Sequence, residues 1–155
     1  MPSQSRSGSA RENKLLEEKM RYIYSMAGAL QNKPKVGNGD CVALVRYYAS
    51  VPSHQMWKAG EDVLDNKNIV PGTAIATFIK GRYPSMDHGN RAAFFLRHGA
   101  PGTGFRVIDQ WKNRQGRGEK KDISSRFIRN LHRKQNKDGS WPDASDNAQA
   151  FSVIE

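Results

Sequence analysis

Hydrophobic and polar positions divide the chain into a helical first part and a strand-rich second part. Apolar side chains recur at near-helical spacing through residues 11–31 and predict an amphipathic helix that ends before Pro34. A turn of glycine, asparagine and aspartate follows at 37–40, and the apolar stretch 41–49 after it predicts a second helix. Trp57 lies in a less regular segment, where it either begins a short helix or fills the core.

From residue 69 onward the pattern changes to the short alternating runs that are typical of β-strands. These runs are bounded by Gly, Pro and Asp and predict strands at 73–79, 92–96, 105–111, 123–131 and 151–154. In the third of them, Val107 and Asp109 face one side of the strand, whereas Ile108 and Gln110 face the other. Helices followed by strands predict an α+β fold with an antiparallel sheet packed on the N-terminal helices.

Length and composition favour one folded domain. With 155 residues the chain suits a single domain over residues 11–155, preceded by a Ser-rich tail at 1–10. No apolar run approaches the roughly 18 residues of a membrane span, and the first residues lack the apolar core of a signal peptide. The single cysteine excludes an internal disulfide and fits synthesis in a reducing cytoplasm. Export by a machinery that reads no cleavable signal remains open.

The charge of the chain is strongly positive and locally concentrated. The formal net charge of +10 attracts polyanions such as nucleic acid, anionic lipid or peptidoglycan. Residues 112–137 contain ten basic and two acidic side chains, a net charge of +8. Aromatic side chains in and around this run, Phe127 among them, leave nucleic-acid binding as an alternative function. No helix-turn-helix, zinc finger or aromatic RNA-binding signature is found, so a solvated basic face is the simpler interpretation.

The chemistry of the chain is most concentrated around Cys41. This residue lies where the turn meets the second predicted helix, and a helix N-terminus favours the nucleophilic thiolate. A lone cysteine is nevertheless more often an inert buried residue. His88, near a strand start, is the candidate general base, and Asp109 on the next strand is the candidate orienting group. Backbone N–H groups around Asp40 and Cys41 are candidates for an oxyanion hole.

The remaining histidines suggest no further site. His54 and His98 are expected on solvated loops, and His132 is expected at the surface of the basic run. No group of His, Cys and Asp has the spacing of metal ligands, so neither a metal nor another cofactor is expected.

Five ordered blocks and a C-terminal segment resemble the type VI secretion amidase effectors, and the second amidase effector family most closely. The blocks are residues 39–45, 57–60, 72–78, 89–96 and 107–112, and the tail is 147–154. The resemblance covers roughly residues 36–155 and implies a papain-like fold of the NlpC- and CHAP-like cysteine peptidase superfamily. It further implies hydrolysis of stem-peptide cross-links in peptidoglycan, secretion by the type VI apparatus into the periplasm of a target bacterium, and a cognate immunity protein.

The chain departs from this family at the position of the general base. The family's catalytic histidine corresponds to the residue directly before Ala92, which here is Arg91. Arginine stays protonated, so it can hold a thiolate by charge but cannot return a proton to the leaving amine. His88 lies three residues earlier, about 10 Å away in an extended strand and on its opposite face. Two alternatives follow: an enzyme that uses His88 after a local bulge, or an impaired relative that binds peptidoglycan without cleaving it.

Overall fold

The structure is a computed structural model that describes residues 21–84, 86, 90–112 and 118–155. The tail predicted at 1–10, the first half of the helix predicted at 11–31, and His88 therefore lie outside the described residues. The main elements are the helix α2 (Cys41–Ala49) and the strands β1 (Ala59–Asp62), β2 (Ala74–Thr77), β3 (Ala92–His98), β4 (Gly104–Asp109), β5 (Ser124–Arg129) and β6 (Phe151–Ile154). Short 3-10 turns occur at Ala27–Leu30, His54–Met56, Ala144–Asp146 and Ala148–Ala150.

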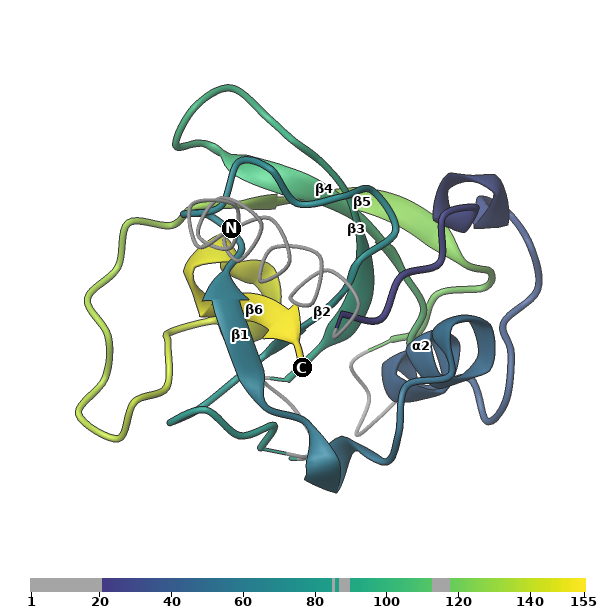
Figure 1. Cartoon of the computed structure of the whole chain (residues 1–155), viewed down its shortest axis with the longest axis horizontal. Helices are drawn as coiled ribbons and strands as arrows, with labels where there is room; N and C mark the ends of the chain where they lie inside the picture. The colour runs from purple at the N-terminus through teal and green to yellow at the C-terminus, as the bar shows by residue number, and fades with distance from the viewer. Residues whose placement is uncertain (1–20, 85, 87–89, 113–117) are drawn as a thin grey trace, which may run out of the picture.

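One six-stranded sheet organises the described part of the chain. Its strand order is β1-β6-β2-β3-β4-β5, and every neighbouring pair is antiparallel. Figure 1 shows α2 beside the sheet, with the yellow-green segment that links β5 to β6 extending on the opposite side. This arrangement confirms the predicted α+β, papain-like architecture, in which a cysteine-bearing helix precedes and packs on an antiparallel sheet.

The sheet separates two hydrophobic clusters, and alternation along β3 assigns its side chains to them. Ala92 and Phe94 pack with Leu44 and Val45 of α2 in the first cluster. Ala93 and Phe95 belong to the second cluster, which the C-terminal segment also covers. Because strand side chains alternate between faces, the face on which a β3 or β4 residue lies determines whether it can approach α2.

The helix α2 has the bounds that the sequence predicts, and its ends follow from local chemistry. Asp40 occupies the N-cap position with extended backbone, and Ser50 ends the helix in the left-handed conformation, its N–H donating to the Arg46 carbonyl. Cys41, Leu44 and Val45 are buried, the spacing expected of a helix with one apolar face. The carboxylate of Asp40 makes no capping hydrogen bond to the first turn, although aspartate is a common N-cap residue.

The predicted N-terminal helix is wrong over residues 21–31. Only Ala27–Leu30 forms a single 3-10 turn, and Ile23 instead forms an isolated bridge with Thr73. The N–H of Tyr24 donates to the Gly72 carbonyl at 2.9 Å, so this segment pairs with the start of β2. Aromatic and β-branched residues favour that extended pairing over a helix. Gly72 permits it, since a Cβ there would lie 2.1 Å from the Tyr24 carbonyl oxygen.

Two features of the irregular segment become clear in the structure. Trp57 is fully buried and donates its indole N–H to the Pro52 carbonyl at 2.8 Å, which confirms that it fills the core. Residues 59–62 form the edge strand β1, which the sequence did not predict because its four residues lack an apolar alternation. Within the described ranges, none of the helices is both long and apolar enough to cross a membrane.

Candidate active site

The thiol of Cys41 lies at the junction of α2 and β3, almost completely buried. Its side chain is only 3% exposed. The backbone N–H of Ala92 points at Sγ with a donor distance of 3.4 Å, and the hydroxyl of Tyr83 lies 3.8 Å from Sγ. The sulfur thus has two polar neighbours although it belongs to a hydrophobic cluster, which distinguishes it from a cysteine that only fills the core.

Gln110 fixes the turn that carries Cys41, and sequence reasoning assigned it no role. Its side-chain amide donates to the carbonyls of Val36 and Asp40, and its oxygen accepts the N–H of Val36. All three contacts are between 2.7 and 3.0 Å, and the side chain is fully buried. The alternation of β4 placed Gln110 on the face opposite Asp109, so the pattern contained the signal for a polar residue on this side.

Burial determines the protonation of the nucleophile candidate more than the helix terminus does. Desolvation of the enclosed thiol raises the pKa of Cys41 above its ordinary value. The Arg91 guanidinium, the Ala92 N–H and the Tyr83 hydroxyl lower the pKa of this thiol, but they do not outweigh burial. The expectation that the helix start makes Cys41 a resting thiolate is therefore wrong in its net direction. A base must take the proton when the sulfur reacts.

A cavity of about 500 Å³ adjoins the cysteine. Residues on both sides of the sulfur line it, among them Asp40 and Val42 from the start of α2, and Tyr83 and Asn90 from the segment before β3. His54 lines the same cavity, with its ring 5.6 Å from that of Tyr83. The sequence suggested a solvated loop for His54, because nothing in the local pattern indicates that the chain folds back over the cysteine.

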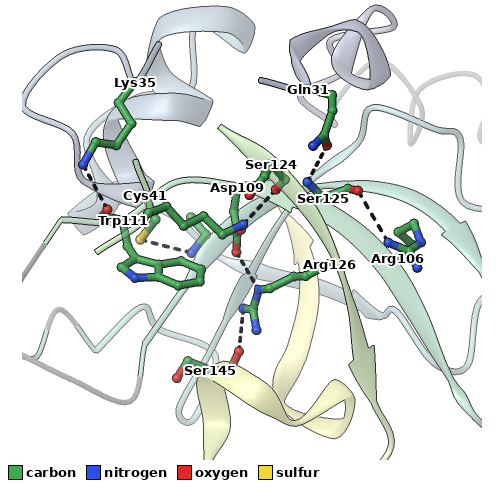
Figure 2. A network of polar contacts seen from close by, with 12 residues as sticks. Gln31, Lys35, Cys41, Arg106, Asp109, Trp111, Ser124, Ser125, Arg126 and Ser145 are labelled. Atoms are coloured by element: carbon green, nitrogen blue, oxygen red, sulfur yellow. Dashed lines mark hydrogen bonds and ion pairs between the residues drawn. The ribbon is translucent and has the colours of Figure 1, made fainter. Parts of the chain in front are cut away.

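Asp109 does not face this cavity but is buried among cations. Its two carboxylate oxygens bind Lys120 Nζ at 2.6 Å and Arg126 Nε at 3.1 Å, and its side chain is inaccessible to solvent (Figure 2). On β4 it shares a face with Val107, which packs in the second cluster, away from α2. The charged side chains that Asp109 contacts are thus Lys120 and Arg126. That Asp109 orients a base stays a prediction, and its contacts favour a structural role.

The indole ring of Trp111 lies near three cationic side chains, two of which also bind Asp109. The Arg91 guanidinium lies 4.5 Å from the centroid of the indole ring, Lys120 Nζ lies 4.6 Å from it, and the Arg126 guanidinium 5.4 Å. Each distance suits a cation–π contact. Part of the basic run is thus engaged internally rather than presented to a polyanion.

The remaining histidines have different positions. His98 packs against Phe95 and contacts the Asn66 carbonyl at 2.8 Å, so it is part of the fold rather than of a solvated loop. His132 is exposed, as the sequence predicted. His88, the predicted base, lies outside the described residues.

We expect Asp109→Asn to lower stability without a matching loss of turnover. Removing the buried carboxylate leaves Lys120 without its ion-pair partner and Arg126 with Asp146 alone, a cost of about 3 kcal/mol. Denaturant unfolding measures this change. Asp146→Asn is the matched control, because the Asp146 carboxylate binds the same Arg126 at 2.7 Å while its side chain is 72% exposed. That substitution should cost less than about 1 kcal/mol. A stable Asp109→Asn protein that has lost turnover would contradict the structural role.

Comparisons with known proteins identify relatives along most of the chain. The family model described as domesticated amidase effector 2 matches residues 21–141. A protein of Salmonella typhi named type VI secretion amidase effector 2 is 44% identical over 138 residues, which are 88% of this chain and the whole of that protein. A solved structure titled type 6 secretion amidase effector 2 superposes with a TM-score of 0.78 at 43% identity, covering 86% of this chain and 94% of that one. The chain thus belongs to the domesticated amidase effector 2 family.

Proposed function

We propose that this protein is a peptidoglycan amidase that cleaves stem-peptide cross-links through the thiol of Cys41. One observation carries this proposal: in a chain whose relatives are named amidase effectors, the single cysteine begins a helix beside a cavity of about 500 Å³. The cavity is large enough to receive a peptide segment next to the sulfur. The net charge of +10 supports attraction to the anionic cell wall.

The reaction is acyl transfer to sulfur followed by hydrolysis. A base takes the Cys41 proton as Sγ attacks the scissile carbonyl carbon, and the carbonyl π electrons move to oxygen. Backbone N–H groups at the start of α2 are the proposed oxyanion donors, because a helix N-terminus leaves its first N–H groups without intrahelical acceptors. The base then protonates the leaving amine as the C–N bond breaks. Water, deprotonated by the same base, cleaves the thioester to a carboxylate and restores the thiol.

His88 is the proposed base, and His54 is its rival. His88 precedes Asn90 by two positions in the sequence, and Asn90 contacts Tyr83 beside the sulfur. His54 already lines that cavity. One of these histidines must act as a base, because burial raises the pKa of Cys41 and keeps its thiol protonated at rest.

The biological setting follows the relatives' names and stays part of the proposal. We infer synthesis in the cytoplasm, delivery by the type VI secretion apparatus into the periplasm of a target bacterium, and a cognate immunity protein in the producing cell. Residues 11–155 form the proposed catalytic domain, and residues 1–10 form the proposed tail.

Digestion of purified sacculi tests the activity directly. We expect the protein to release new muropeptides in which one peptide bond has become a free amine and a free carboxylate, detected by chromatography and mass spectrometry. Because Arg91 replaces the expected histidine and the sulfur is buried, an inactive relative that only binds the wall is the second candidate. Co-sedimentation with sacculi in the absence of any new product would overturn the amidase and favour that binding protein.

A further inference from the structure

Tyr83 contacts the candidate nucleophile and also lines the cavity. Its hydroxyl oxygen is 3.8 Å from Cys41 Sγ, and the residue also lines the cavity. The ring packs against those of Trp57, at 4.8 Å, and His54, at 5.6 Å, between ring centroids. With only 8% of its surface exposed, the side chain has little freedom to turn away. The position of the hydroxyl is therefore set by packing.

Asn90 determines the direction in which this hydroxyl donates. The Asn90 amide nitrogen donates to the Tyr83 oxygen at 2.8 Å. The oxygen accepts in this bond, so the hydroxyl proton is left for another acceptor, and Sγ lies within reach. Burial also raises the pKa of Tyr83 far above its ordinary value, so the hydroxyl keeps its proton at any working pH.

The side-chain oxygen of Asn90 points to a ligand that binds here. The Asn90 side-chain oxygen is buried and has no hydrogen-bond partner among the described residues. A buried acceptor without a donor is costly unless something binds to it. Beside the Tyr83 hydroxyl, it makes a donor and an acceptor that together match the C=O and N–H groups of a peptide.

We propose that Tyr83 is a catalytic hydrogen-bond donor and that Asn90 positions it while accepting an N–H group of the substrate peptide. This inference rests on the proposed function. In the resting protein the hydroxyl donates to Sγ. When the S–C bond forms and the carbonyl electrons move to oxygen, the hydroxyl donates to that oxyanion without transferring its proton. The preference for a peptide group over other ligands follows from this paired donor and acceptor.

The first test measures the thiol and needs no substrate. Cys41 is the single cysteine, so its alkylation by iodoacetamide reports on this sulfur alone. Tyr83→Phe removes one donor to the thiolate, so we expect the alkylation profile to move to higher pH, with a slower rate at any pH below the new midpoint. Tyr48→Phe is the matched control, because Tyr48 packs on Tyr24 and Tyr47 instead. Coincident profiles for the wild type and Tyr83→Phe would overturn the proposal.

The second test uses turnover on cross-linked muropeptides. We expect Tyr83→Phe to lower kcat by about 10²-fold with little change in KM, because the lost donor acts mainly in the transition state. Asn90→Leu should lower kcat in the same direction and raise KM as well. The double variant should lose less than the product of the two single effects, since both act through one hydroxyl. Undiminished kcat in Tyr83→Phe overturns the catalytic role, whatever the alkylation result.

The two proposals can fail separately. A wild-type protein that releases no product from any peptidoglycan, yet shows the expected alkylation shift, would overturn the amidase while supporting Tyr83 as the donor to sulfur. A wild-type protein that digests sacculi with kcat unchanged by Tyr83→Phe would support the amidase and overturn the donor. Thermal unfolding of each variant confirms that the comparison is made on folded protein.

Discussion

We expect the Cys41→Ala variant to release no new muropeptides from sacculi, with a loss of at least about 10³-fold relative to the wild type. Without the sulfur no acyl-enzyme intermediate forms, and water alone is a much weaker nucleophile than a cysteine thiolate. The structure supports a direct role for the sulfur. The Ala92 N–H and the Tyr83 hydroxyl contact it, and the Arg91 guanidinium lowers its pKa, whereas a cysteine that only fills the core needs no such neighbours. Product analysis after prolonged digestion measures the residual rate.

Two controls separate this chemical effect from damage to the fold. Removing the buried sulfur should cost about 1 kcal/mol, so the thermal midpoint of Cys41→Ala should fall by only a few degrees. Binding of the variant to sacculi should persist, since the cavity and the net charge remain. A folded Cys41→Ala protein that still cleaves the wall would remove the thiol from the mechanism, and with it every role assigned around it.

The elements that the sequence predicted well are those whose pattern is decided locally. Helix α2 and strand β6 have the predicted bounds, because an apolar helix that follows a glycine-rich turn and a short apolar strand are each recognisable within ten residues. Residues 21–31 failed for the opposite reason. Their spacing suits a helix, but their backbone pairs with residues 72 and 74, about fifty positions away. Tertiary pairing of this kind overrides local propensity.

The candidate site residues Cys41, His88 and Asp109 stay predictions, and the sequence did not indicate which face of the sheet lies toward α2. Alternation placed Asp109 and Gln110 on opposite sides of β4, which the structure confirms, yet it does not say which side α2 covers. Gln110 holds the cysteine turn, and Asp109 binds two cations on the other side. Tyr83, beside the sulfur, and His54, in the adjoining cavity, were missed because both lie outside α2 and the strands, where no periodicity indicates direction.

The thiol's protonation illustrates a further limit. A helix start is visible in the sequence, and its effect on a thiol is favourable to the thiolate. Desolvation depends on every neighbour that encloses the sulfur, and these come from α2, β3 and the segment around Tyr83. Only the assembled core reveals that burial is the larger effect. This result makes the identity of the base the decisive question for turnover.

Loss of the general base should be the second largest effect, and three variants assign it. We expect His88→Ala to lower kcat by roughly 10²- to 10⁴-fold and to remove the acid limb of the pH–rate profile, because a neutral imidazole must accept the Cys41 proton. His54→Ala, the matched control from the same cavity, should change kcat by less than about tenfold. The reverse result would transfer the role to His54.

Arg91→His completes the assignment. If residue 91 occupies the family's base position, Arg91→His should supply an imidazole base. We then expect kcat to rise by about 10²-fold if the wild type has no working base, and we expect Arg91→His to restore the activity that His88→Ala loses. The structure gives a competing expectation. The Arg91 guanidinium stacks on Trp111 and lowers the pKa of Cys41, so its replacement also removes a charge that favours the thiolate. If Arg91→His alone lowers kcat and does not restore the activity lost in His88→Ala, then Arg91 acts by stabilising the thiolate with its charge. The general base would in that case be supplied by another segment.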